Sequence, residues 1–338
     1  MFNAMGDTWK RTRATFTPIF TSGKMKTMLH FIKEGSDHLT AELAKKSKTR
    51  EEFDLKEVYG KFSLGSIASC AFGIDAQCFT DEKSTFVKHT ANILTGTVVE
   101  NLLEFVVLVP GLKRFLEIFN INIFKPTSSR YLRDIVVKSM EARRKSKERR
   151  NDMIDFMLDC IDKVGEKSED EGFIESKDQF DKDQSFSHDR KGAKLTSDDV
   201  VATALTVLVA GYDTTAITLS YLSYSLAKHP HVQQKLQEEV DQAFDDNSGE
   251  LPDYSTIMTL PYLDMVIQET LRKHSPVGMN TRTCTQDYRI PSTDITVRKG
   301  DLLTFSVAGF HQDLKHFSHP DDFYPEHFSK EERAARSP

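Results

Sequence analysis

A glycine, an acid and two threonines interrupt the most apolar stretch of this chain, at residues 210–215 (Ala-Gly-Tyr-Asp-Thr-Thr). The flanking segments, 200–209 and 216–222, are rich in Val, Leu, Ala and Ile, as expected of a long buried helix. Glycine inside a helix costs about 1 kcal/mol relative to alanine, and a buried carboxylate costs more unless it is paired. Because both occur together here, we expect a functional site, with another group close against the backbone of Gly211.

The composition describes a globular chain and excludes several classes of protein. Of 338 residues, 38% are hydrophobic and 28% are charged, and the net charge of −6 argues against a general nucleic-acid binder. Since no stretch reaches 18 consecutive apolar residues, no membrane-spanning segment is predicted. The four cysteines are widely spaced and are expected to be reduced thiols, in neither a disulfide framework nor a metal site: Cys70, Cys78, Cys160 and Cys284.

Helical periodicity dominates, so the predicted fold class is mainly α with a small β-sheet late in the chain. Thr196 with Asp199 resembles a capping box that starts the long apolar helix, and Pro230 suits the first position of the next helix. Short strands are expected near residues 287–291 and 295–307. The predicted helices are 7–48 with a break near Pro18, 53–72 ending at Gly73, 127–163, 197–229, 231–244 and 262–273.

Two polar regions are predicted to carry no chemistry. Residues 165–192 are charged and aperiodic, which predicts a flexible surface loop. The arginines and lysines of residues 143–150 are interpreted as a solvated helix face rather than a nucleic-acid patch.

Two residue pairs can carry chemistry. Glu269 and Arg272 are three positions apart and share a helical face, and taken alone they describe a surface ion pair. Trp9 and Arg13 are four positions apart, so the indole N–H and the guanidinium can reach one carboxylate or phosphate. The alternative for this second pair is a tryptophan packed in the core, with the arginine extended along it towards solvent.

Taken together and in order, these features resemble the signatures of cytochrome P-450, the haem-thiolate monooxygenases, over essentially the whole chain. The signatures are Trp9-x-x-x-Arg13, residues 210–215, Glu269-Thr270-Leu271-Arg272 and Phe323-Tyr324-Pro325-Glu326-His327-Phe328. The resemblance is closest to the clan that includes the vertebrate 3A subfamily. Residues 16–24, 229–239 and 262–266 resemble the sequences of that clan.

The resemblance implies an oxygen-activation site at the centre of the long helix. Gly211 would let the haem and dioxygen approach the backbone. The Thr214 hydroxyl would widen the helix locally and hold the iron-bound peroxide by hydrogen bonding. Asp213 would deliver protons to the distal oxygen, and Ala210 would face both the haem and the substrate.

The resemblance also implies where haem b and the substrate bind. Trp9, Arg13 and Arg282 would bind the two haem propionates. Val277 and Gly278 would line the substrate pocket together with Ala210.

A further implication is a structural network on the proximal side of the haem. Glu269 and Arg272 would be buried there and would hold the meander to the helical core, in place of the surface pair considered above. The family's third member of this network is an arginine, where this chain has His327. Histidine is shorter and often neutral, which predicts a weaker network or a substitute donor nearby.

The implied architecture is a P-450 fold incomplete at both ends. We expect one partial monooxygenase domain over residues 1–338, from the family's helix C to its meander, without the amino-terminal anchor and the Gly-rich cysteine loop. None of the four cysteines fits that loop, so the chain as given is expected to lack the axial haem ligand and to be inactive.

The implied partners are those of a microsomal enzyme. They are dioxygen, a small apolar substrate, an NADPH-dependent reductase, cytochrome b5 as a further electron donor, and the cytosolic face of the endoplasmic reticulum membrane. The apolar, Phe-rich residues 93–124 would dip into that membrane surface. The alternatives are a peroxide-rearranging relative, a catalytically dead helical protein that binds lipids or other apolar molecules, and a truncated product without a stable fold.

Overall fold

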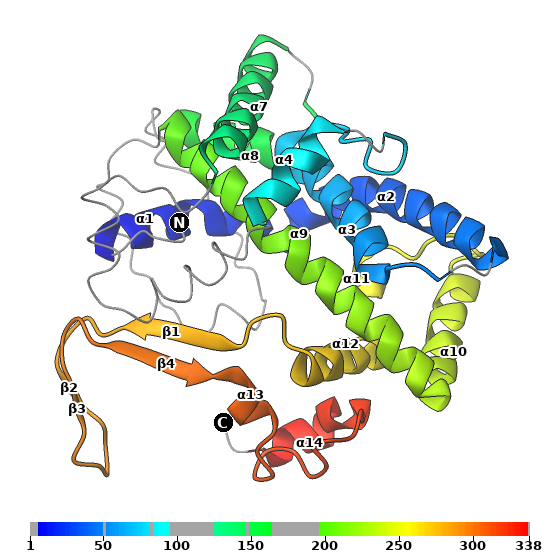
Figure 1. The fold of residues 1–338 in the computed structure, drawn as a ribbon, viewed down its shortest axis with the longest axis vertical. Helices are drawn as coiled ribbons and strands as arrows, with labels where there is room; N and C mark the ends of the chain where they lie inside the picture. The colour runs from blue at the N-terminus through cyan, green and yellow to red at the C-terminus, as the bar shows by residue number, and fades with distance from the viewer. Residues whose placement is uncertain are drawn as a thin grey trace. The chain divides into compact units, whose positions relative to one another are not determined.

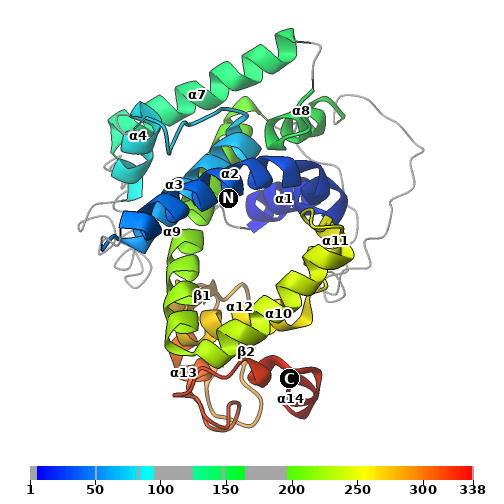
Figure 2. The same ribbon diagram turned by 90° about the vertical axis from the view of Figure 1, so that its right-hand side faces the viewer.

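The computed structural model describes residues 6–49, 52–81, 84–94, 125–146, 149–163 and 196–336. These residues are mainly helical with two small two-stranded sheets, which confirms the predicted fold class (Figures 1 and 2). The predicted surface loop at 165–192 and most of the predicted membrane-facing segment at 93–124 lie outside the described residues. The chain divides into two compact units, Met1–Thr95 with Phe124–Asp213, and Gly96–Ile123 with Thr214–Pro338.

The described residues of the first unit are mainly helical. They share a hydrophobic core, to which the first half of α9 contributes Val200, Ala204 and Leu208. Its elements are α1 (Gly6–Phe16), η1 (Thr17–Phe20), α2 (Ser22–Thr49), α3 (Leu55–Ile67), η2 (Ala68–Phe72), α4 (Thr85–Leu94), α7 (Pro126–Lys145), α8 (Met153–Lys163) and the beginning of α9 (Ser197–Lys228).

The expected helix over residues 53–72 is confirmed with one refinement at its end. After α3, η2 has π-helical hydrogen bonding and ends at Gly73, whose φ of 65° is the left-handed conformation that favours glycine. A β-carbon at Gly73 would meet the side chains of Arg143 and Asp152, so neighbouring helices also require glycine at this position.

The prediction of one helix over 127–163 is wrong, because α7 ends at Lys145 and α8 begins at Met153. The Asp155 carboxylate accepts hydrogen bonds from the backbone N–H groups of Arg150 and Asn151, each at 2.8 Å. These bonds supply an alternative to helical hydrogen bonding and turn the chain.

The interpretation of residues 143–150 as a solvated face is also wrong in part. The Arg143 side chain is 11% exposed and binds the buried carboxylate of Asp152 at 2.7 Å and that of Asp155 at 3.3 Å. Burial raises the pKa of Asp152, and Arg143 counters that effect. An arginine on this face therefore closes a buried ion cluster where α7 meets α8.

The start of α9 follows the predicted capping box. The Thr196 N–H donates to the Asp199 carboxylate at 2.9 Å, and the Asp199 N–H donates to the Thr196 hydroxyl at 3.2 Å. Among the described helices, α9 is the one long and apolar enough by length and composition to cross a membrane, although a third of its most apolar window (33%) is buried within the structure. Because its first half lies in the core of the first unit, we interpret α9 as a core helix.

The second unit begins within α9 and combines helices with short strands. Val232 and Leu236 of α10 and Tyr262 and Val266 of α12 form its core with Phe323. Its further elements are α10 (Pro230–Asp246), α11 (Tyr254–Ile257), α12 (Pro261–Lys273), β1 (Met279–Thr283), β2 (Tyr288–Arg289), β3 (Thr296–Val297), β4 (Leu302–Ser306), α13 (Val307–His311), η4 (Pro325–Phe328) and α14 (Lys330–Ala335).

The strands of the second unit form two antiparallel pairs. β1 pairs with β4 from Met279 opposite Ser306 to Thr283 opposite Leu302, and β2 pairs with β3. The predicted strands near 287–291 and 295–307 are therefore present in shorter form, and β1 is an additional strand.

Candidate functional site

The acid of the central motif is not buried within the part of the chain that the structure describes. Asp213 lies in α9 and pairs with Lys56 of α3, with 3.0 Å between Lys56 Nζ and Asp213 Oδ1. The side chains are 39% and 52% exposed respectively, so the expectation of a buried carboxylate is wrong. The reason is that this turn of α9 meets the first turn of α3, where both charged groups keep water contact.

The glycine and tyrosine before Asp213 pack tightly against the same helix. A β-carbon built on Gly211 would lie 2.7 Å from Ile67 Cδ1, closer than packed carbon atoms approach. The Ser63 hydroxyl donates to the Tyr212 carbonyl at 2.9 Å, and Gly60 leaves room for the Tyr212 ring. A side chain of α3 thus lies close to the backbone of Gly211.

The Trp9 and Arg13 side chains lie together on α1. The Arg13 guanidinium stacks over the indole ring, 5.4 Å from its centroid, which is within the range of a cation–π contact. Trp9 is half-buried and Arg13 is exposed, and no carboxylate pairs with Arg13 among the described residues. The two side chains therefore present N–H donors beside one another on the surface of the first unit.

Glu269 and Arg272 form a fully buried pair in the second unit. Arg272 Nε and Nη2 donate to the two Glu269 oxygens at 2.7 Å each. The remaining N–H groups donate to the carbonyls of His311, Pro320 and Asp322 at 2.9 Å. All the donors of this guanidinium are thereby used, and α12 is joined to the segment that follows α13.

His327 is the third side chain at this carboxylate. Its Nδ1 lies 3.3 Å from each Glu269 oxygen, and the ring is buried between Phe317 and Tyr324. Burial lowers the pKa of His327, although the Glu269 carboxylate opposes that effect. A neutral ring follows, whose Nδ1–H donates to Glu269 while Nε2 has no hydrogen-bond partner among the described residues.

A second cation lies beside His327. The Arg336 guanidinium packs over the Phe317 ring at 4.5 Å, and its charge acts on both His327 and Glu269. Within the described segments no hydrogen bond joins Arg336 to Glu269, so Arg336 contributes nearby positive charge rather than the substitute donor expected from the sequence.

The residues expected to contact substrate and the second propionate are exposed in the second unit. Val277 and Gly278 immediately precede β1, and Val277 is 46% exposed. Arg282 on β1 donates to the Thr281 carbonyl at 2.8 Å, which leaves most of its guanidinium donors towards solvent.

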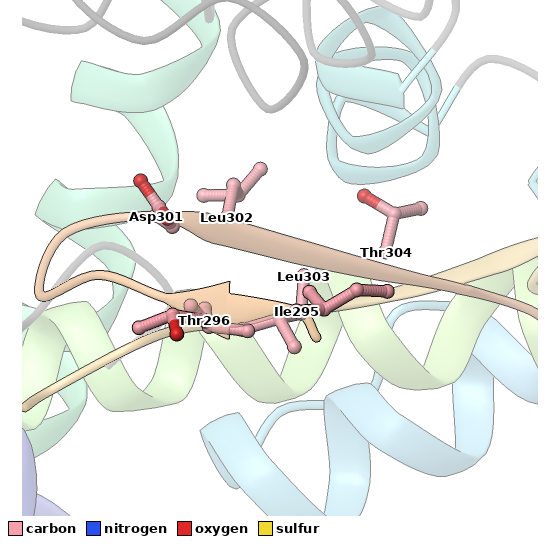
Figure 3. Close-up of a pocket in the computed structure, with 7 residues that line it drawn as sticks. Ile295, Thr296, Asp301, Leu302, Leu303 and Thr304 are labelled. Carbon is pink, nitrogen blue, oxygen red and sulfur yellow. The ribbon is translucent and has the colours of Figure 1, made fainter. Parts of the chain in front are cut away.

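A shallow hollow of about 410 Å³ lies beside β3 and β4 (Figure 3). Leu302 and Thr304 project from β4, Asp301 immediately precedes that strand, and Ile295 and Thr296 lie on a second segment that lines the hollow (Figure 3). None of the residues expected to bind cofactor or substrate lines this hollow, so it adds nothing to the candidate site.

The four cysteines are free thiols. Burial raises the pKa of Cys70 and of Cys78 to about 12, so both remain protonated at neutral pH. The Cys284 thiol donates to the Gln286 carbonyl at 2.8 Å. Across the residues that the structure describes, no group of three or more His, Cys, Asp or Glu side chains could hold a metal ion.

The residues that sequence reasoning missed are the partners of the motif rather than the motif itself. Lys56, Ser63 and Ile67 meet α9 from a helix far earlier in the chain. Their spacing marks one face of α3, but only the fold shows what that face contacts. Arg336 was missed because its packing on Phe317 likewise joins residues without a local pattern.

Comparison with known proteins places these features in a family. Residues 1–338 match the family described as cytochrome P-450. The chain is 31% identical over 338 residues to cytochrome P-450 6B2 of Helicoverpa armigera, covering 100% of this chain and 63% of that protein. It is 34% identical over 325 residues to cytochrome P-450 3A6 of Oryctolagus cuniculus, covering 96% of this chain and 60% of that protein. For cytochrome P-450 3A2 of Rattus norvegicus, the identity is 33% and the coverage is 99% and 62%.

Proposed function

Because this chain belongs to the cytochrome P-450 family and spans about three fifths of the length of these curated relatives, we propose that it is part of a haem-thiolate monooxygenase. The proposed reaction inserts one oxygen atom of dioxygen into a small apolar substrate. The other atom leaves as water, with the electron pair supplied by NADPH through a reductase. The observation that supports this most directly is an acid followed by an alcohol, Asp213-Thr214, in the middle of α9.

The residues present fit the carboxylate groups of haem b. Trp9 and Arg13 offer adjacent N–H donors at the surface of α1, and Arg282 offers a largely solvent-facing guanidinium on β1. Arginine and indole donors suit carboxylates, so we assign these three residues to the propionates. When bound, haem supplies the iron centre at which dioxygen is activated.

The axial thiolate does not fit the cysteines of the two units. Cys70 and Cys78 are held as neutral thiols by burial. Cys160 lies in α8 and Cys284 in a turn after β1, and neither has the glycines of a ligand loop. We therefore propose that none of them ligates the iron, and that the chain as given is inactive by itself.

The chain's own residues have the following proposed roles. The Asp213 carboxylate, which keeps water contact, would take up protons from solvent and release them towards the haem-binding region. The Thr214 hydroxyl would orient the group that accepts these protons by hydrogen bonding to it. Ala210 presents a small apolar surface to the substrate, with Val277 and Gly278 as further contacts.

The proposed partners and location follow from the same assignment. Electrons come from an NADPH-dependent reductase and, as a second donor, from cytochrome b5. The proposed location is the cytosolic face of the endoplasmic reticulum membrane. Residues 93–124 would contact that membrane, since an apolar, Phe-rich segment suits a bilayer surface.

The test of the acid–alcohol pair uses a haem-loaded full-length protein containing this chain, with reductase, NADPH and an apolar alkoxycoumarin as probe. Asp213→Asn is expected to lower product formation by about 10²-fold or more, the usual size of a general-acid contribution. Thr214→Val is expected to divert electrons to hydrogen peroxide. Thr215→Ala, at an exposed position of the same helix, is the control. Unchanged product and peroxide in both variants would refute the proposal.

The test of the axial ligand uses the chain alone. After addition of hemin, reduction and exposure to carbon monoxide, we expect none of the long-wavelength Soret band that marks thiolate ligation. Appearance of that band, and its loss in a Cys→Ser variant, would show that one of these cysteines is a ligand after all.

A further inference from the structure

The α3 helix lies beside α9 (Figures 1 and 2). One face of α3 contacts three successive residues of the central motif in α9. Intervals of four, three and four residues put the contributing side chains on a single helical face. The contributors are Lys56, Gly60, Ser63 and Ile67, and they meet Gly211, Tyr212 and Asp213.

The closest approach is between Ile67 and Gly211. A β-carbon on Gly211 would lie 2.7 Å from Ile67 Cδ1 but 3.5 Å from Ile67 Cγ1. The first distance is impossible for packed carbons and the second is an ordinary contact. Alanine at position 211 therefore requires the terminal methyl group of Ile67 to shift.

The second contact joins Ser63 to the backbone of α9. The Ser63 hydroxyl lies 2.9 Å from the Tyr212 carbonyl and 3.2 Å from the Gly60 carbonyl in its own helix. A β-carbon at Gly60 would contact the Tyr212 hydroxyl oxygen at 3.4 Å and the Tyr212 ring at 3.5 Å. Ser63 and Gly60 therefore fix the position of α9 along its axis, and its rotation about that axis, at Tyr212.

The third contact holds the acid itself. The Asp54 side chain caps α3 by accepting the Lys56 N–H at 2.7 Å, which fixes the backbone from which Lys56 extends. The Lys56 ammonium then reaches Asp213 Oδ1 at 3.0 Å. The carboxylate is thereby held towards α3 at a point open to water.

We propose that α3 is the positioning element of the Asp213–Thr214 pair. Ile67 sets how closely α9 approaches α3, and Lys56 holds the Asp213 carboxylate in a defined direction. Gly211 lets α3 approach α9 without displacing the Ile67 side chain. What the positioned pair does rests on the proposed function, whereas the helix contact itself does not.

The helix contact is tested by a double-mutant cycle on the thermal unfolding of this chain. Gly211→Ala with Ile67 present is expected to lower Tm by about 2–4 °C or more, because the new methyl group clashes. In an Ile67→Val background, which lacks Cδ1, the same substitution is expected to raise Tm slightly, because alanine is the better helix former. The sign of the effect should therefore reverse.

Gly65→Ala is the matched control for this cycle. A β-carbon at Gly65 on α3 would make only ordinary contacts with Cys78, at 3.8 Å or more, so its effect should be the same in the parent chain and in the Ile67→Val background. If Gly211→Ala lowers Tm equally in both backgrounds, the proposed contact is overturned.

The positioning role is tested in the haem-loaded full-length protein by the peroxide released per NADPH. Lys56→Met is expected to raise this ratio severalfold and Lys56→Arg to restore it. Lys61→Met is the control, since Lys61 lies on α3 and pairs with Glu57 instead. Gly211→Ala should raise the ratio, and adding Ile67→Val should lower it again.

Different results would overturn the positioning role of α3 and the proposed function of Asp213 and Thr214. Loss of coupling in Lys56→Met without rescue by Lys56→Arg, or thermal rescue by Ile67→Val without recovery of the peroxide ratio, would overturn the positioning role. If Asp213→Asn and Thr214→Val leave both product and peroxide unchanged, the proposed function fails, while the thermal cycle still reports on the helix contact alone.

Discussion

The Arg272 guanidinium and the Glu269 carboxylate, three residues apart on α12, share two hydrogen bonds of 2.7 Å in a site where both side chains are buried. Arg272 also donates to the carbonyl of His311 at the end of α13 and to those of Pro320 and Asp322 between α13 and η4. A planar guanidinium can serve a carboxylate and several carbonyls at once, whereas an ammonium group has only three N–H donors. This pair therefore connects α12 to the rest of the second unit through hydrogen bonds.

Arg272→Lys should strongly destabilise the second unit. Lysine keeps the charge but loses the bidentate geometry and leaves buried carbonyls without donors, so we expect a loss of about 3–5 kcal/mol in the free energy of unfolding. Urea unfolding followed by circular dichroism measures this loss.

The matched control is Arg289→Lys. Arg289 pairs with Asp294 at 3.0 Å, but the two side chains are 69% and 103% exposed. Exposed pairs contribute little, so the control should change stability by less than about 1 kcal/mol. Equal losses of unfolding free energy in the two variants would contradict the proposal that buried hydrogen bonds of Arg272 connect α12 to the rest of the second unit.

Stability should fall as the pH is lowered through the range in which histidine titrates. Burial is the first cause that lowers the pKa of each of His274, His311 and His327. Below about pH 6.5 the unfolded chain therefore binds protons that the folded chain does not. The stabilisation is complete above that value and is lost as the pH falls towards the folded-state pKa values.

The measurement is the free energy of unfolding at several pH values for the parent chain and for His327→Gln. Burial raises the pKa of Asp152, which acts in the opposite direction, so the difference between the two proteins isolates His327. We expect the parent to lose more stability than the variant on acidification. Parallel curves would show that His327 is not held neutral in the folded chain.

Gly73→Ala should lower the free energy of unfolding far more than the same substitution at Gly249. Both glycines have positive φ, 65° and 81°, so alanine costs about 1–2 kcal/mol at either position. At Gly73 the new β-carbon would lie 2.5 Å from Arg143 Nη2 and 2.6 Å from Asp152 Oδ2, whereas Gly249 faces open space. Disruption of the buried pair adds several kcal/mol. Similar midpoints in urea for the two variants would argue against this close contact.

The elements predicted well from the sequence are those specified by neighbouring residues. Thr196 and Asp199 are close enough in the chain for their reciprocal hydrogen bonds to be anticipated, and Pro230 begins α10 as expected. The break between α7 and α8 was missed because residues 146–152 contain neither glycine nor proline. The turn depends instead on the Asp155 carboxylate and on an Asn151 with φ of 59°.

The candidate site shows the same division between local and distant causes. The motif at residues 210–215 was recognised because glycine and acid conflict with an apolar helix. Its surroundings were not, since Lys56 and Ile67 reach it from α3 and no local pattern links them to α9. Apolar composition also overestimated burial, because Tyr221 and Tyr224 of α9 are exposed in the structure.

Glu239→Gln, a change in α10, should destabilise the first turn of α12. The α12 helix begins at Pro261 without a capping side chain of its own, and the Glu239 carboxylate of α10 accepts the N–H groups of Tyr262 and Leu263 at 2.8 Å each. A carboxylate here satisfies two terminal donors and complements the helix dipole. Glutamine retains one acceptor and turns an NH₂ group towards the other donor, so we expect a loss of about 1–2 kcal/mol in the free energy of unfolding.

Glu238→Gln is the control for this last change, because the exposed Glu238 carboxylate binds only the Gln234 side chain, at 3.0 Å, among the described contacts. That substitution should alter stability by less than about 0.5 kcal/mol. Since α12 also carries Glu269 and Arg272, amide hydrogen exchange in α12 should accelerate in Glu239→Gln and remain unchanged in Glu238→Gln. Equal exchange in the two variants would mean that the Glu239 carboxylate does not stabilise the start of α12.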